Sequence, residues 1–186
     1  EVVTENYSGI ATVNGHSYAN YRTNNTNFAL LVSEKFTEPF KEPIAYGQHV
    51  ARLANMLAGG VLVQRFGDLL DGRRSTPERI KSSIITPTLS CATPGDLSLV
   101  LPYRQMTAII EMLYALDKIA PGTASRYTLL YGIEVKFYSG RVKLTNDLET
   151  EGVKNLYAIG DGAGVTRGLI QASASGVHAA RVICSK

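Results

Sequence analysis

The sequence predicts an α+β fold in which a mixed sheet packs against helices. Strand-like segments come first, two helices with regular apolar spacing follow, and a hairpin and one strand–helix segment end the chain. This order lacks the strict alternation of strands and helices that predicts a parallel α/β sheet. With 45% hydrophobic and 19% charged residues, the composition is typical of globular proteins, and 186 residues are enough for one large or two small domains.

The N-terminal part of the chain is predicted to form strands. Residues 1–3 are already strand-like, and Gly9–Tyr18 and Phe28–Val32 are predicted strands. The asparagine-rich cluster Asn24–Asn27 between them predicts a turn.

Two helices are predicted from apolar residues spaced three or four apart. The first is Ala45–Leu57, which Gly59-Gly60 ends, and its apolar face consists of Tyr46, Val50, Leu53 and Leu57. The second runs from Pro102 to about Ile119 and stops at Pro121-Gly122. Its apolar face consists of Met106, Ile109, Ile110, Leu113 and Leu116.

The remaining segments are shorter or less regular. Val61–Val63 predicts a short strand, and Leu69–Thr93 is rich in turn signals and predicts loops. Tyr127–Tyr138 predicts a long strand, which Gly140 turns into a hairpin with Arg141–Leu144. The polar stretch Asn146–Lys154 then links to the C-terminal segment.

The C-terminal segment carries the most informative pattern. Leu156–Ile159 predicts a buried strand, a Gly-Asp-Gly-Ala-Gly turn follows at 160–164, and a helix begins near Gly168. This geometry directs backbone N–H groups and a helix N-terminus toward an anion. The pattern is not a complete G-x-G-x-x-G fingerprint, because Val165 or Arg167 occupies the third glycine position. We therefore expect the closing strand and helix of a fold whose opening half lies elsewhere.

The same residues resemble a known family. Tyr157-Ala-Ile-Gly-Asp-Gly-Ala-Gly164, with Gly168, Gln171 and Gly176-Val-His-Ala-Ala180, resembles the second flavin-binding motif of two-dinucleotide-type FAD oxidoreductases. Matches to the bacterial FAD-dependent dehydrogenase family of undefined substrate occur in the same order along the chain. They are Val13–Tyr18, Asn25–Val32, Val63–Asp68 with Gly72-Arg73, Thr86-Pro87, Leu101-Pro102, Gly132–Glu134 and Arg141-Val142. Lys136 departs from the arginine that is usual in the family.

This resemblance implies a domain organisation and a cofactor. Members of the family carry G-x-G-x-x-G in an N-terminal FAD-binding half, so residues 1–146 would be an inserted substrate or cap domain and residues 147–186 a returning segment of the FAD-binding domain. FAD is then expected in the full-length parent. The chain alone is expected to lack FAD and to be inactive. Its expected partners are the N-terminal half of the same polypeptide and an unknown small-molecule substrate.

The resemblance also implies site residues. Asp161 would bind a ribityl hydroxyl of FAD, and the helix beginning near Gly168 would direct its positive end toward the reduced flavin. The expected cofactor-binding residues are Gly160, Asp161, Gly162, Ala163, Gly164, Gly168 and Gln171. The catalytic acid or base stays unassigned, although Tyr18, Glu134 and Arg141 occupy positions suggested by the family.

Other candidate sites are weaker. A basic stretch, Arg65, Arg73, Arg74, Arg79 and Lys81, could hold an anion, but nearby Asp68, Asp71 and Glu78 favour a solvated loop of mixed charges. His16 could approach the flavin in the parent, whereas His49 and His178 are expected to be surface and structural residues, respectively. The sequence shows no set of residues with metal-ligand spacing.

Composition excludes some classes of function and leaves others open. A net charge of +3 is too small to indicate nucleic-acid binding, and no apolar run approaches the length of a membrane-spanning helix. Cys91 and Cys184 are expected to be free buried thiols in a reducing cytoplasm. An apolar surface on the orphan strand–helix segment predicts self-association. A small-ligand or protein-binding module without redox chemistry, or a purely structural domain, remains an alternative to the oxidoreductase fragment.

Overall fold

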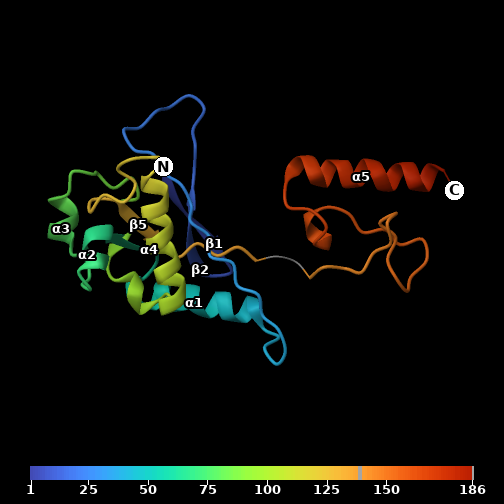
Figure 1. The fold of residues 1–186 in the computed structure, drawn as a ribbon, viewed down its shortest axis with the longest axis horizontal. Coiled ribbons are helices and arrows are strands. Elements are labelled where there is room, and N and C mark those ends of the chain that lie inside the picture. The colour runs from blue at the N-terminus through green and yellow to red at the C-terminus, as the bar shows by residue number, and fades with distance from the viewer. Residues whose placement is uncertain (138–139, 186) are drawn as a thin grey trace. The chain divides into compact units, whose positions relative to one another are not determined.

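The computed structural model describes residues 1–137 and 140–185. It divides into two compact units, Glu1–Val135 (unit 1) and Lys136–Lys186 (unit 2), which are traced in Figure 1. This division falls before the boundary at 146/147 that the sequence suggests. The reason is that residues 140–145 are tied into unit 2, where Leu144 forms a bridge with Thr150 and the Val142 N–H donates to the Ala163 carbonyl over 3.3 Å.

Unit 1 begins with an antiparallel hairpin of β1 (Val2–Tyr7) and β2 (Ile10–Gly15). Ser8 and Gly9 both have positive φ, and the Gly9 N–H donates to the Asn6 side chain over 2.8 Å. Such a two-residue turn matches the twist of the two strands. Strand structure is therefore confirmed for residues 2 and 3, while the predicted strand Gly9–Tyr18 ends at Gly15.

The predicted strand Phe28–Val32 is wrong. The segment contains no regular secondary structure, and the side chains of Phe28, Leu31 and Val32 are exposed. Strand-forming residues become a strand only when a neighbouring strand accepts them and their side chains pack on a surface. No strand of the described chain pairs with this segment.

The central sheet of unit 1 is mixed and has the order β4-β3-β5. β3 (Leu62–Arg65) runs parallel to β4 (Thr93–Pro94) and antiparallel to β5 (Leu129–Gly132). β3 confirms a short strand near Val61–Val63, but β5 is much shorter than the predicted Tyr127–Tyr138, whose last residue lies outside the described residues. The predicted hairpin with Arg141–Leu144 is also wrong, because β5 pairs with β3 instead.

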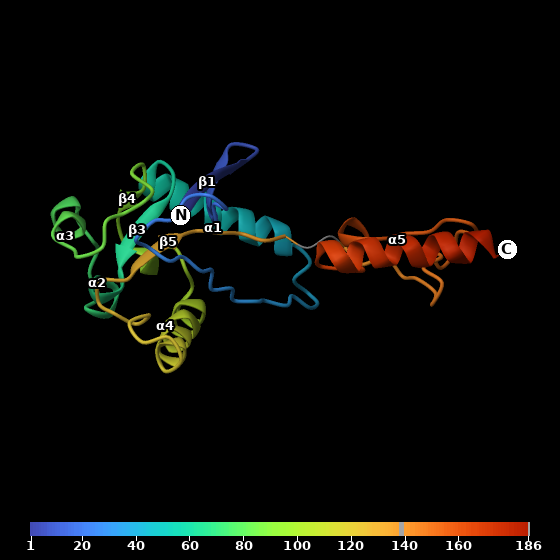
Figure 2. The same ribbon diagram turned by 90° about the horizontal axis from the view of Figure 1, so that it is seen from above.

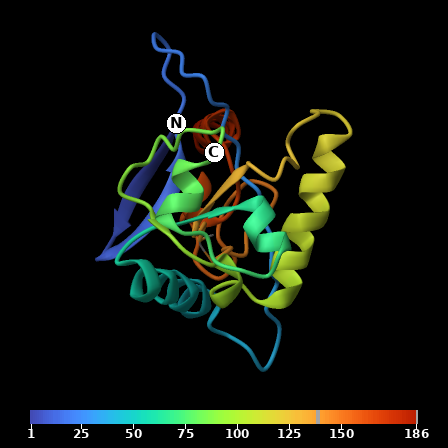
Figure 3. The same cartoon turned by 90° about the vertical axis from the view of Figure 1, so that its left-hand side faces the viewer.

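Both long helices of unit 1 are confirmed as α1 (Pro43–Ala58) and α4 (Tyr103–Asp117). Gly59 ends α1 in the left-handed conformation, with φ of 67°. Figures 2 and 3 show α1 and α4 on different sides of the β3–β5 strands. The core lies between these elements, and its buried side chains include Val50, Ala54, Leu62, Phe66, Leu97, Met106 and Leu113. The α+β class expected from the sequence is thus confirmed.

The predicted loop Leu69–Thr93 contains more structure than expected. The short helix α2 (Phe66–Leu70) extends into it, and α3 (Pro77–Lys81) lies wholly inside it. Thr76 caps α3 by accepting a hydrogen bond from the Arg79 N–H, and proline occupies the first helical position. A 3₁₀ turn, η1 (Leu97–Leu99), follows β4. These elements shape the polar surroundings of β3.

One side chain joins α1 to the hairpin. The Asn55 amide accepts a hydrogen bond from the Ala11 N–H over 2.8 Å and donates to the Ala11 carbonyl over 2.7 Å. It also donates to the Gly60 carbonyl over 3.1 Å. Farther along β2, the Val13 N–H donates to the Ile133 carbonyl over 3.1 Å. The outer edge of β2 is therefore bonded to other parts of unit 1.

Unit 2 consists of a 3₁₀ turn, η2 (Asp161–Ala163), the long helix α5 (Leu169–Cys184) and irregular segments with two isolated bridges. The prediction of a buried strand at Leu156–Ile159 is wrong. Its two end residues are 51% and 46% exposed, and only Tyr157 makes a bridge, to Glu149. This segment lacks the partner strands that would continue such a bridge into a ladder.

Two further sequence expectations concern the surface. Cys91 and Cys184 are free, as expected, but both are exposed rather than buried. Unit 2 also exposes large apolar side chains, which include Leu156, Ile159, Leu169, Ile170, Val177 and Ile183. Self-association through them stays a prediction. Among the described residues, no helix has the length and apolar character needed to cross a membrane.

Candidate functional site in the glycine turn

The glycine turn of unit 2 is built on hydrogen bonds to α5. Gly160 has φ of 73°, a conformation that favours glycine. Its N–H donates to the Ser175 hydroxyl over 3.0 Å, and that hydroxyl donates to the Ala172 carbonyl over 2.7 Å. Because Ser175 is buried in α5, the helix fixes the start of the turn.

Asp161 is exposed, and its carboxylate is held in place. The Thr166 hydroxyl donates to Asp161 Oδ1 over 2.5 Å, while the Gly164 N–H donates to the Asp161 carbonyl over 3.0 Å. A carboxylate can accept several hydrogen bonds at once. The Thr166 contact therefore helps to orient the acidic group.

The glycines of the turn differ in what surrounds them. A Cβ added to Gly162 would meet no atom within 4 Å, so a ligand could approach the backbone there. Gly164 faces inward, with φ of 68°, and a Cβ added to it would lie 2.9 Å from the Arg141 Cα atom. Ala163 is also buried in unit 2. The open side of the turn is therefore formed by Asp161 and Gly162.

The N-terminus of α5 is the third part of this site. No side chain of the described residues accepts a hydrogen bond at the start of the helix, and Leu169 and Ile170 in its first turn are 88% and 80% exposed. Gly168 precedes them in an extended conformation, and a Cβ added to it would lie 2.6 Å from Gln171 Oε1. The positive end of the α5 dipole thus lies beside exposed apolar side chains. This combination suits a ring that carries negative charge.

The candidate cofactor residues therefore share one short segment of unit 2, between Gly160 and Gln171. A hydroxylated ligand could bond to Asp161 and a flat ligand could approach Gly162. The sequence did not single out Thr166 or Ser175, although each fixes part of the turn. The sequence shows that Thr166 follows Asp161 by five residues, but the hydrogen bond between them depends on how the turn closes.

The basic stretch of unit 1 forms a partly buried polar cluster. Asp68 is 1% exposed and accepts hydrogen bonds from Arg73 Nε over 3.0 Å and from the Ser75 hydroxyl over 2.8 Å. Arg65 NH1 lies 3.9 Å from the same carboxylate, and its guanidinium carbon lies 5.2 Å from the centre of the Tyr127 ring. The expectation of a fully solvated loop is thus wrong for Asp68.

At the surface of this cluster, Asp71 pairs with Arg126 over 2.5 Å and with Arg73 over 3.1 Å. The hydrogen bond from Arg126 lowers the pKa of the Asp71 carboxyl, and the positive charges of Arg126 and Arg73 act in the same direction. Arg73 and Arg126 are therefore already paired with carboxylates.

The other candidates are dispersed. Tyr18 is exposed and its ring centre lies 4.8 Å from that of His16, while Glu134 is half-buried; all three belong to unit 1. Arg141 belongs to unit 2, where its backbone contacts Gly164. His49 and His178 are exposed on their helices. The described part of the chain brings no three histidine, cysteine or acidic side chains together as metal ligands.

Comparisons with known proteins show which family the chain is similar to. The sequence model of the family "FAD-dependent protein, C-terminal domain-like" matches residues 2–137, which include all of unit 1 except Glu1. A curated protein of Clostridium beijerinckii (strain ATCC 51743 / NCIMB 8052), described as an uncharacterized protein, is 31% identical over 196 residues. That alignment covers 100% of this chain but 36% of the relative, so the chain spans about a third of the relative's length.

Proposed function

The chain belongs to the FAD-dependent protein C-terminal domain-like family, and from this premise we propose that it is part of an FAD-dependent oxidoreductase, specifically a dehydrogenase. Unit 1 would be the substrate or cap domain, and unit 2 would return to the FAD-binding domain. The remaining N-terminal part of the parent would supply the other half of the cofactor site. The length of the Clostridium relative supports this division, because most of that protein lies outside the alignment.

The proposal rests on the arrangement of the glycine turn. The carboxylate of Asp161 is held by Thr166 and lies next to the open Gly162, and the N-terminus of α5 carries no side-chain cap. Asp161 would accept a hydrogen bond from a ribityl hydroxyl, and Thr166 would keep its carboxylate oriented. Gly160 and Gly162 would let the backbone approach the cofactor, and the first turn of α5 would stabilise negative charge on it. When bound, FAD would supply the hydride-transfer chemistry. Ala163, Gly164, Gly168 and Gln171 would complete or support this surface.

The isolated chain should hold FAD weakly. The turn supplies one carboxylate, a short stretch of backbone and one helix end, whereas the phosphates and the adenosine need partners that this segment does not contain. Each tenfold loss of affinity corresponds to only about 1.4 kcal/mol, so the loss of a few contacts is enough to abolish stable binding. Titration of FAD into the isolated chain and into the full-length protein measures this difference.

The proposal is tested by Asp161→Ala in the full-length protein. Loss of a hydrogen bond to a charged group removes about 1.5–3 kcal/mol, which predicts about a 10- to 150-fold weaker FAD affinity. Thr166→Val should produce a smaller loss, because the carboxylate remains but is less well oriented. Asp147→Ala, which removes another exposed carboxylate of unit 2, is the matched control and should leave the affinity unchanged.

Flavin content is read from visible absorbance after purification and from dialysis against known FAD concentrations. Unchanged affinity in Asp161→Ala, or an equal loss in Asp147→Ala, would remove the role assigned to Asp161. A full-length protein that binds no flavin at all would instead favour the alternative of a binding module without redox chemistry.

A further inference from the structure

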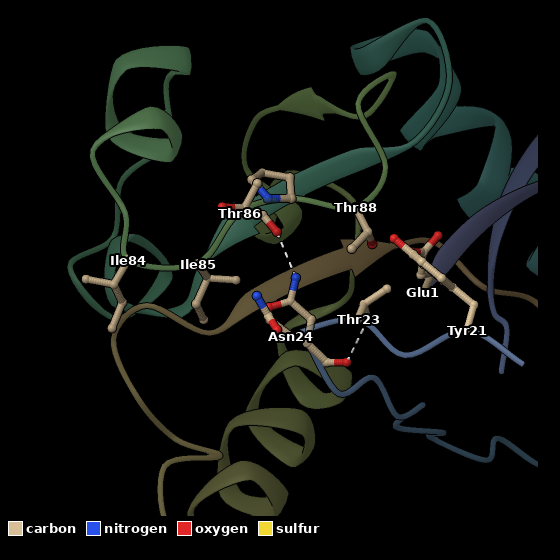
Figure 4. A pocket seen from close by; sticks show the side chains of 10 residues that line it. Glu1, Tyr21, Thr23, Asn24, Ile84, Ile85, Thr86 and Thr88 are labelled. Atoms are coloured by element: carbon tan, nitrogen blue, oxygen red, sulfur yellow. Dashed lines mark hydrogen bonds between the residues drawn. The ribbon is translucent and has the colours of Figure 1, made fainter. Parts of the chain in front are cut away.

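Unit 1 contains a pocket that the flavin proposal does not use. Its volume is about 550 Å³, and it is lined by Glu1, Tyr21, residues 23–25 and residues 84–88. Figure 4 shows it between the segment that carries Asn24 and the segment that carries Thr86. The volume lies within the range of small-molecule sites, about 300–1,000 Å³. Every wall comes from unit 1.

The walls of this pocket are joined by hydrogen bonds although neither segment is a helix or a strand. Asn25 Nδ2 donates to the Thr86 carbonyl over 2.8 Å, as the dashed line in Figure 4 shows. The Val2 N–H donates to the Thr88 hydroxyl over 3.3 Å, and the Thr23 hydroxyl donates to the Asn25 carbonyl over 3.2 Å. The two walls are therefore connected before any ligand binds.

Two other polar side chains of the lining are able to form hydrogen bonds with a ligand. Among the described residues, the Asn24 amide and the Thr86 hydroxyl make no hydrogen bond, and both residues are exposed. An amide offers two donors and an acceptor, and a hydroxyl offers one donor and two acceptors. Tyr21, which is 64% exposed, adds an aromatic surface at the rim.

The charges of the lining restrict the ligand further. The lining side chains include no lysine, arginine or histidine, and their one carboxylate is that of Glu1. The α-amino group of Glu1 is bonded to the His16 carbonyl over 2.6 Å. An anion would therefore meet a negative charge and no positive side chain to offset its desolvation. An apolar ligand would bury the amides and hydroxyls without partners, which is also unfavourable. A neutral ligand with many hydroxyl groups avoids the repulsion and can form hydrogen bonds with the amides and hydroxyls.

We propose that this pocket binds a neutral polyhydroxylated molecule of the carbohydrate class. Asn24 and Thr86 bond to ligand hydroxyls from the two walls, and Tyr21 packs against the C–H face of the ring. Asn25 is a positioning residue, because its amide joins the walls. All the lining residues belong to unit 1, and the proposal does not rest on the flavin proposal.

The test measures sugar binding to the full-length protein by saturation-transfer NMR and calorimetry, with glucose, galactose and N-acetylglucosamine as probes. Each lost neutral hydrogen bond is expected to weaken binding about 2- to 12-fold, so the double variant Asn24→Ala/Thr86→Val should lose about 4- to 140-fold. Thr4→Val changes an exposed threonine of β1 that does not line the pocket, and it should bind like the wild type.

Several outcomes would overturn the proposal. One is that the wild type binds none of the three sugars, and another is that the double variant binds them as well as the wild type. Equal losses in Thr4→Val, or displacement of a bound sugar by inorganic phosphate, would contradict it as well. Far-UV circular dichroism checks that each variant is folded. Flavin content is measured on the same samples, so a failure here is distinguishable from a failure of the flavin proposal.

Discussion

Asp68→Ala tests whether the buried polar cluster beside β3 stabilises unit 1. The carboxylate is 1% exposed, and its removal takes away hydrogen bonds from Arg73 Nε at 3.0 Å and the Ser75 hydroxyl at 2.8 Å. It also removes the ion pair with Arg65, whose guanidinium lies 3.9 Å from the carboxylate. The Nε atom of Arg65 is buried without a hydrogen-bond partner among the described residues. Removing one member of a buried ion pair typically costs about 3–5 kcal/mol, and we expect the lower part of this range because Arg73 is half exposed.

The measurement is urea denaturation followed by near-UV circular dichroism, because most tyrosines of the chain lie in unit 1. With a slope of about 2 kcal/mol per molar urea, the expected cost lowers the midpoint by about 2 M. Asp71→Ala is the matched control, since it removes a neighbouring carboxylate that pairs with arginines at the surface. Solvent and salt weaken such pairs, so its midpoint should change far less.

Equal midpoints for the two variants would refute this reasoning. If Asp68→Ala does not accumulate as folded protein, Ser75→Ala provides the same test in milder form. It removes the hydroxyl that donates to Asp68 and that accepts from the Arg65 N–H over 2.9 Å. The expected cost is about 1–3 kcal/mol, because the buried partners lose bonds that water cannot replace.

Two further predictions concern other sites. Burial raises the pKa of the Tyr131 hydroxyl, and the backbone groups of Leu89 and Thr88 oppose this only in part. The unfolded chain then loses this proton near pH 10 while the folded chain keeps it, so stability falls as the pH rises past about 10. Urea midpoints at about pH 9 and pH 11 should show this fall, and Tyr131→Phe should reduce it; an unchanged fall would contradict the assignment. In unit 2, Gly164→Ala should cost at least about 1–2 kcal/mol from its positive φ, apart from the contact with Arg141. Hydrogen exchange at the Val142 amide should speed up in this variant and not in Gly60→Ala, where a Cβ has open space.

The elements that the sequence predicted well are those determined by local pattern. α1 and α4 follow from apolar spacing and from stop signals such as Gly59, all within a few turns of chain. α3 was missed, because its segment was predicted as a loop, although Thr76-Pro77 is a local signal of a helix cap followed by proline at the first position. The strand predicted at Phe28–Val32 failed because a strand depends on a partner far away in sequence.

In the candidate site too, the local features could be predicted from the sequence and the tertiary contacts could not. The glycines and Asp161 were visible as a motif, and the start of α5 near Gly168 is confirmed. The hydroxyl groups that fix the turn could not be assigned, because the contact of Thr166 depends on how the turn closes and that of Ser175 on how α5 packs against the turn. Burial of Asp68 likewise depends on tertiary packing, since its own neighbourhood in sequence is rich in charges.

The side-chain amide of Asn55 imitates one residue of a β-strand, because it both donates to and accepts from Ala11. It thereby occupies a position where a strand from another molecule could otherwise add to the hairpin. A substitution that shortens this side chain would uncover those backbone groups while the hairpin itself stayed paired. Its effect would then include intermolecular β-sheet formation as well as weaker packing of α1.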